Sequence, residues 1–141
     1  MTHLPLRSKL FMDNRSRFVK EMKPGSIAIF NSNDQMPENA DATLGFVQNS
    51  DLYWLTGIQQ EDTMLFLFPD HPDPAWREVL VLVRPSELRE KWIGHRLTAG
   101  EGKAISGVKA VIWLDELESV LPGLMHIAEN VYLNTNEHDK G

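Results

Sequence analysis

Two short, almost wholly apolar segments constrain the fold more than any other feature of the sequence. Residues 63–68 read TMLFLF, and residues 78–83 read EVLVLV. Between them, residues 69–77 contain three prolines and two aspartates, a composition typical of turns. An apolar run without alternation is typical of a strand that is covered on both sides. We therefore predict an antiparallel hairpin in the middle of a sheet, with packed elements on both faces.

The segment before this hairpin predicts a helix followed by a strand. Over residues 6–22, apolar residues fall roughly on one side of a helical wheel and charged residues mostly on the other. The apolar set is Leu6, Leu10, Phe11, Phe18, Val19 and Met22, and the charged set is Arg7, Lys9, Asp13, Arg17 and Lys20. Pro24-Gly25 stops the helix, and Ser26–Phe30 reads as a short strand. Residues 31–42 read as a polar surface loop.

The segment after the hairpin adds a mostly polar stretch, residues 85–107, then two strands with a helix between them. Ala110–Trp113 and Asn130–Leu133 read as the strands. Asp115 can cap a helix that runs to about Leu124. Its apolar side would be formed by Leu117, Val120, Leu121 and Leu124. The predicted fold class is therefore α/β, a mixed sheet flanked by helices.

The composition limits the kind of protein. The chain has 141 residues, 42% hydrophobic and 24% charged, which fits one ordinary domain, residues 1–141, with a core of its own. Its net charge of −6 argues against a nucleic-acid partner, because phosphate binding needs clustered Lys and Arg. The absence of cysteine excludes disulfides and thiolate chemistry. No apolar run approaches the ~20 residues of a membrane span, so we expect a soluble, cytoplasmic protein with no membrane partner.

The residue types that carry catalysis do not form a recognisable site. The five histidines, His3, His71, His95, His126 and His138, are scattered, and none has a zinc-binding spacing. There is no G-x-S-x-G motif, and residues 100–102 lack the rest of a phosphate-binding loop. Glu61-Asp62 could hold a cation, but solvated charge is the commoner role of such a pair. We therefore predict no catalytic residue and no metal ligand in this chain.

Two stretches stand out against this background, and the first is residues 48–57, QNSDLYWLTG. Ser50 or Asp51 can cap a short helical turn, and Gly57 can end it in a left-handed conformation. As a structural corner, the stretch would place three residues in the core: Leu52, Trp54 and Leu55. As a binding surface, it would turn three others toward a partner: Gln48, Asn49 and Tyr53.

The second stretch is residues 91–97, KWIGHRL. Trp92 offers a flat apolar face, and Arg96 offers a planar donor for two hydrogen bonds. Gly94 permits a backbone course that a side chain would obstruct. These properties suit a recognition surface. Equally, Trp92 could close the side of the core while Arg96 pairs with a local acid.

In this order and separation, the two stretches resemble the N-terminal domain of aminopeptidase P, the Xaa-Pro aminopeptidase family. The matching residues are Gln48–Gly57 and Trp92–Arg96, and Met22–Ser26 at the end of the first helix fits the same pattern. The resemblance covers residues 10–134. It implies a mixed sheet flanked by helices, as in the N-terminal domains of creatinase and prolidase, which are ribonuclease H-like.

The resemblance also implies a two-domain enzyme. A "pita-bread" catalytic domain, expected downstream of Gly141, would bind two divalent metals, commonly manganese, through Asp, His and Glu. It would release the N-terminal residue of a peptide substrate with proline in second position. This chain would then hold no cofactor and be inactive alone. Its partners would be its own catalytic domain and, in a dimer or tetramer, other copies of the protein.

By the same resemblance, five residues are candidates for the active-site entrance or a contact between subunits: Trp92, Gly94, Arg96, Tyr53 and Asn49. Trp92 would stack on the apolar side of the substrate, and Arg96 would fix the loop or meet a carboxylate. Two alternatives stay open, a free-standing binding module of the same fold and the N-terminal domain of a prolidase- or creatinase-type enzyme. Residues 135–141 read as a linker cut at Gly141, although a frayed native tail would look the same.

Overall fold

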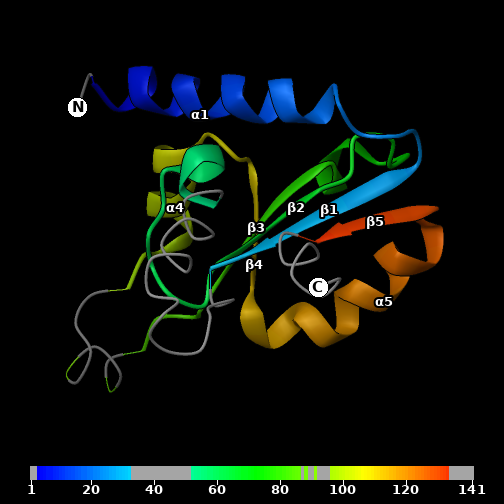
Figure 1. The fold of residues 1–141 in the computed structure, drawn as a ribbon. Helices are drawn as coiled ribbons and strands as arrows, with labels where there is room; N and C mark the ends of the chain where they lie inside the picture. The colour runs from blue at the N-terminus through cyan, green and yellow to red at the C-terminus, as the bar shows by residue number, and fades with distance from the viewer. Residues whose placement is uncertain (1–2, 33–51, 87, 89–90, 92–95, 134–141) are drawn as a thin grey trace, which may run out of the picture.

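The described part of the chain is built around a five-stranded sheet. In the computed structural model it comprises residues 3–32, 52–86, 88, 91 and 96–133. The strands are β1 (Ser26–Asn31), β2 (Met64–Leu67), β3 (Glu78–Leu82), β4 (Ala110–Trp113) and β5 (Asn130–Leu133). They lie in the order β4-β3-β2-β1-β5 (Figure 1).

The pairing makes the sheet mixed, as predicted. β2 is antiparallel to both β1 and β3, and Met64 lies opposite Val81 in the predicted hairpin. β5 is parallel to β1, and β4 is parallel to β3. Every strand except β2 therefore runs in one direction, so their carboxyl ends share one edge of the sheet. The strands predicted at residues 26–30, 110–113 and 130–133 are confirmed.

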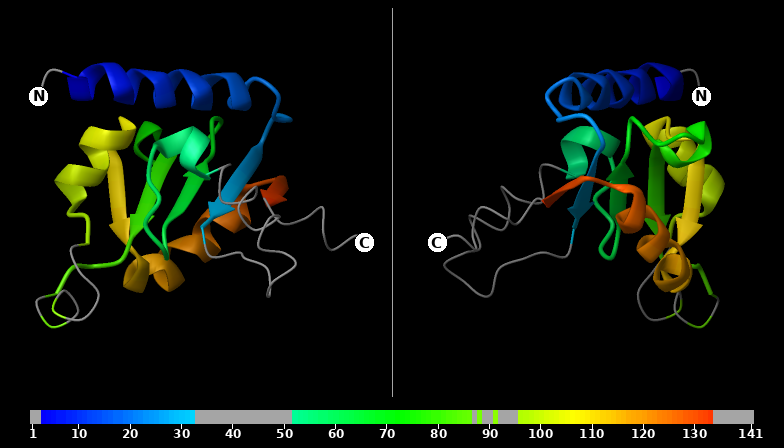
Figure 2. Two further views of the ribbon diagram at one scale, coloured as in Figure 1. Left: turned by 60° about the vertical axis from the view of Figure 1, so that its left-hand side comes forward. Right: turned by 90° about the vertical axis from the view of Figure 1, so that its right-hand side faces the viewer.

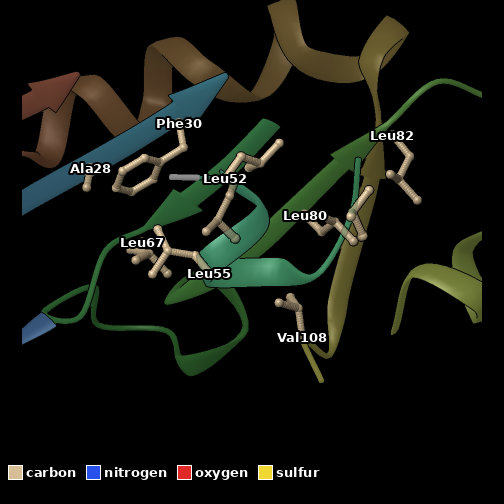
Figure 3. Packing of buried hydrophobic residues seen from close by; sticks show 10 residues of the cluster. Ala28, Phe30, Leu52, Leu55, Leu67, Leu80, Leu82 and Val108 are labelled. Carbon is tan, nitrogen blue, oxygen red and sulfur yellow. The ribbon is translucent and has the colours of Figure 1, made fainter. Parts of the chain in front are cut away.

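Each face of the sheet carries its own hydrophobic cluster, because successive side chains of a strand point to opposite faces. Figure 3 shows the first cluster, in which residues of β1, β2 and β3 meet residues of the segment 52–58 and Val108, which follows α4 (Ala99–Ser106). It consists of Ala28, Phe30, Leu52, Leu55, Ile58, Leu65, Leu67, Leu80, Leu82 and Val108. The second consists of Ile27, Ile29, Phe66, Phe68, Val79, Val81 and Leu124. The prediction of a hairpin covered on both faces is confirmed.

Helices provide the cover. α1 (His3–Val19), a helical turn at residues 52–56 and α4 (Ala99–Ser106) cover the first face, and α5 (Leu117–Ile127) covers the second (Figure 2). Two short 3-10 helices, η1 (Pro74–Trp76) and η2 (Leu114–Glu116), complete the described elements. No helix among the described residues is long and apolar enough to cross a membrane.

The first helix differs from its prediction in which side it buries. Phe11 is buried, but Leu10, which was placed on the apolar side, is 54% exposed. The buried side instead includes two polar residues, Asn14 and Arg15. The physical reason is that α1 lies against the ends of two other helices, whose free carbonyl groups accept hydrogen bonds from these side chains.

Two further predictions are wrong. Trp54 is 46% exposed rather than in the core, because its ring lies beside the Arg17 guanidinium, 6.0 Å from the ring centroid. Asp115 does not cap the last helix. It lies within η2, its carboxylate is bound by Arg84, and α5 begins two residues later at Leu117. The apolar side predicted for that helix does pack on the second face.

Candidate functional site

The five candidate entrance residues fall into two groups. Asn49, Trp92 and Gly94 lie outside the described residues, as do Gln48 and the proposed caps Ser50 and Asp51. Tyr53 and Arg96 are described, and each can be placed among its neighbours. Gly57 ends the turn at residues 52–56 with a φ of +76°, so the predicted left-handed end is confirmed.

Tyr53 lies on the surface next to α1. Its side chain is 37% exposed, and its ring meets that of Phe11 edge-on, with 5.9 Å between centroids. Trp54, beside it, is also exposed. The turn at residues 52–56 therefore presents two aromatic side chains outward while Leu52 and Leu55 are buried beneath them. The described half of the stretch therefore has a buried and an exposed side, and a partner for the exposed side stays a prediction.

Arg96 is buried, with 6% of its surface exposed. Its Nη1 donates to the backbone carbonyl of Glu61 at 3.4 Å, a long hydrogen bond. Its Nε is buried and has no hydrogen-bond partner among the described residues. The next residue, Leu97, donates its backbone N–H to the side-chain oxygen of Gln60 at 2.9 Å. Arg96 and Leu97 thus bind the end of the β3–α4 connection to the loop before β2.

The start of the same connection is held by Arg84. Its guanidinium forms two hydrogen bonds with the Asp115 carboxylate, at 2.9 and 3.0 Å, and lies over the ring of Trp113. These hydrogen bonds, with the opposite charges, lower the pKa of Asp115 and raise the pKa of Arg84. The connection is therefore fixed at both ends, to η2 at its start and to the loop before β2 at its end.

The described residues offer little else for chemistry. No three His, Asp or Glu side chains among them gather as a metal site would require, and Glu61-Asp62 is part of a turn in which Asp62 has a φ of +62°. A groove of about 580 Å³ opens between α1, η1 and the start of β4, with Arg77 and Lys109 in its lining. Neither Tyr53 nor Arg96 lines it.

One buried residue was missed by the sequence reasoning. Arg15 lies on α1 between the ends of two other helices. No sequence motif marks its burial, because its partners are the backbone carbonyls of Leu55 and Ser106. A related pattern can be read from the sequence. The tripeptides Thr56-Gly57-Ile58 and Ser106-Gly107-Val108 are alike, and each marks a helix end.

Comparison with known proteins covers nearly the whole chain. The sequence model of the family described as "Aminopeptidase P, N-terminal domain" matches residues 11–132. The Xaa-Pro aminopeptidase of Escherichia coli strain K12 is 26% identical over 129 residues, which make up 91% of this chain and 29% of that enzyme. The chain therefore spans less than a third of the length of this relative.

Solved structures give the same result. A Bacillus anthracis protein assigned as an aminopeptidase P is 30% identical, with a TM-score of 0.73 over 90% of this chain and 30% of that one. E. coli aminopeptidase P with the inhibitor Pro-Leu is 26% identical, with a TM-score of 0.71 over 89% of this chain and 28% of that one.

Proposed function

Because the chain belongs to the aminopeptidase P N-terminal domain family, we propose that it is the non-catalytic N-terminal domain of a Xaa-Pro aminopeptidase. The observation that carries the proposal is the family match over residues 11–132, together with the small share of the relatives that the chain spans. The parent enzyme is proposed to release the N-terminal residue of peptides with proline in second position.

The catalytic chemistry is assigned to a separate domain of the same protein. Two divalent metals, for which manganese is our expectation, would be held there by Asp, His and Glu. In this chain, the described residues show no grouping that fits such metals, so no catalytic step is derived from them. The chain alone is expected to be inactive.

The contribution of this domain is proposed to be the entrance to the active site. Trp92 would contact the apolar side of the substrate, and Arg96 would hold the connection that carries Trp92. The proposal is supported by the attachment of this connection at both ends, through Arg84 to Asp115 and through Leu97 to Gln60. A connection fixed at its ends can present a side chain at a defined place.

A role in assembly is also proposed, with the catalytic domain and further copies of the protein as partners in a dimer or tetramer. It is supported by large apolar side chains that are exposed in this chain. They are Leu10, Met12, Tyr53, Trp54, Leu88, Met125, Ile127 and Val131. Within the described part of the chain, no further strand pairs with the outer sides of the two edge strands, β4 and β5.

The proposal is tested with the protein of the complete reading frame. We expect it to cleave a peptide with proline in second position, but not the matched peptide with alanine there, and to lose activity when a chelator removes its metal. Cleavage confined to Xaa-Pro dipeptides would point to a prolidase-type enzyme instead. No cleavage of any proline peptide would favour a creatinase-type enzyme or a free-standing binding module.

The entrance role has its own variant, Trp92→Ala in the same protein. If Trp92 binds substrate, the KM for the proline peptide rises while the metal content stays unchanged. Leu88→Ala is the matched control, since Leu88 belongs to the same connection and is 69% exposed. Unchanged kinetics and unchanged oligomeric state in Trp92→Ala would rule the entrance role out.

A further inference from the structure

Arg15 is a wholly buried cation at the meeting point of three helices. Its Nη1 donates to the backbone carbonyls of Leu55 and Ser106, both at 2.8 Å. Its Nε lies 3.2 Å from the carboxylate of Glu78 at the start of β3. Leu55 belongs to the turn at residues 52–56 and Ser106 ends α4, so one side chain on α1 binds the last turns of two other helices.

These two helix ends have the same local structure. In each, a hydroxyl side chain donates to the carbonyl four residues before it and accepts the N–H two residues after it. At the first end Thr56 bonds Leu52 and Ile58 at 2.8 and 3.1 Å, and at the second Ser106 bonds Gly102 and Val108 at 2.8 and 3.1 Å. In each, a glycine with positive φ follows the hydroxyl residue. Arg15 binds the carbonyl of Leu55, one residue before Thr56, at the first end and the carbonyl of Ser106 itself at the second.

The two glycines also let α1 approach. A Cβ atom at Gly57 would lie 2.4 Å from the ring of Phe11, and one at Gly107 would lie 2.6 Å from Cγ of Met12. Phe11 and Met12 are adjacent on α1, so the helix rests on both glycines at once. Because the last carbonyls of a helix lack partners within it and carry partial negative charge, they stabilise the Arg15 cation that lies between them.

The same two segments are joined a second time at their other ends. Residues 52–61 run from the helical turn to Gln60 and Glu61, and residues 96–106 run from Arg96 to the end of α4. Gln60 accepts the Leu97 N–H, and the Glu61 carbonyl accepts from Arg96. Arg15 therefore joins the two segments at one end, and the hydrogen bonds of Gln60 and Glu61 join them at the other.

We propose that Arg15 is a positioning residue, which sets the spacing between residues 52–61 and 96–106 and so holds Arg96 in place against the loop before β2. The significance of Arg96 for an active-site entrance rests on the proposed function. The positioning itself concerns this chain alone and is measured on it.

The test is hydrogen exchange of the Leu97 amide in the wild-type chain, in Arg15→Lys and in Arg7→Lys. A lysine keeps the charge but loses the planar group that reaches both carbonyls and Glu78. We expect Arg15→Lys to lower the protection factor of Leu97 about fivefold or more relative to the amides of β2 and β3, comparable with loss of one hydrogen bond. Arg7→Lys is the matched control, at an exposed arginine of the same helix, and should leave that ratio unchanged.

Two further variants decide the result. Glu78→Gln removes the carboxylate beside Arg15 and leaves the Arg15 cation in place, so it should lower the same protection ratio to a lesser extent. It provides the test if Arg15→Lys does not fold. Gln60→Ala removes the hydrogen bond of the Leu97 amide directly. Adding Arg15→Lys to it should lower the protection factor of Leu97 no further. Protection that falls equally at all amides, or that stays at the wild-type ratio in both Arg15→Lys and Glu78→Gln, overturns the proposal.

A kinetic arm separates this inference from the proposed function. In the protein of the complete reading frame, Arg15→Lys should raise the KM for a proline peptide more than it lowers kcat, and Arg7→Lys should change neither. If the wild-type protein cleaves no proline peptide, the proposed function fails while the exchange result stands. If the wild type cleaves it and Arg15→Lys matches the control in both measurements, the positioning role is wrong.

Discussion

Arg15 and Arg96 are both buried arginines, yet this chain stabilises them to different degrees. Arg15 has two carbonyl partners at 2.8 Å and a carboxylate at 3.2 Å, while its Nε and Nη2 form no hydrogen bond within the described part of the chain. Arg96 has a bond of 3.4 Å to the Glu61 carbonyl, and its buried Nε has no hydrogen-bond partner among the described residues. A buried charge is unfavourable unless hydrogen bonds and opposite charge compensate it.

The difference indicates that Arg15 is the arginine that stabilises the fold of the domain. The partners of Arg15 lie on three elements of this chain, so its removal should disturb the fold. Arg96 has one long hydrogen bond to the described residues, so its removal should disturb them less. The comparison is open to direct tests, and the largest effect concerns Arg15 itself.

Arg15→Met should lower the free energy of unfolding by about 3–5 kcal/mol, mainly because it leaves two buried carbonyls without a donor, at about 1–3 kcal/mol each, while Glu78 is partly exposed and loses less. Urea unfolding measures the change. Arg17→Met, on the exposed side of the same helix, should cost no more than about 1 kcal/mol. Equal losses of unfolding free energy in the two variants would show that the buried contacts of Arg15 do not stabilise the fold more than an exposed arginine does.

Gly57→Ala should lower the free energy of unfolding by about 2–4 kcal/mol without touching Arg15. A left-handed φ costs a side chain about 1–2 kcal/mol, and the Phe11 ring must also move. Gly107→Ala should cost less, since the flexible Met12 can give way. Gly123→Ala in α5 is the control, because nothing lies within 4 Å of its added Cβ. A loss at Gly123 as large as at Gly57 would contradict this account of how α1 is seated.

Arg96→Met should cost this chain about 1 kcal/mol, the loss of one ordinary hydrogen bond, and so less than Arg15→Met. The same urea titration gives the comparison. A loss as large as that of Arg15→Met would mean that Arg96 is also a structural anchor of the domain, and the contrast between the two arginines would disappear.

The smallest effect is expected at the exposed pair of Arg84 and Asp115. The hydrogen bond from Arg84 holds the pKa of Asp115 below its ordinary value of 3.8. A carboxyl group whose pKa is lowered by folding contributes stability above its unfolded pKa and loses that contribution as the pH falls through its folded pKa. Asp115→Asn should therefore remove a small stabilisation that is present at neutral pH and fades in acid. An NMR titration that places the pKa of Asp115 at or above 3.8 would contradict it.

The strands could be predicted from the sequence because their information is local. Continuous apolar runs at residues 63–68 and 78–83 predict a hairpin buried on both faces, and β2 and β3 form it. The left-handed end at Gly57 was equally local, since glycine after a short helical turn is typical of it.

The burial of Arg15 could not be predicted, because its partners are backbone carbonyls 40 and 91 residues away along the chain. Every residue type offers such a carbonyl, so no pattern of side chains marks it. The same packing of α1 on two helix ends explains why Leu10 is exposed against prediction. At the candidate site, Tyr53 and Arg96 could be named from the sequence, while Asn49, Trp92 and Gly94 stay predictions outside the described residues.

The central claim is that this chain supports chemistry carried out in another domain. It is tested most directly by assaying residues 1–141 alone on a peptide with proline in second position, with manganese in excess, beside the protein of the complete reading frame. The account predicts cleavage by the complete protein and none above the blank by the chain alone. Metal-dependent cleavage by residues 1–141 at a rate near that of the complete protein would contradict it.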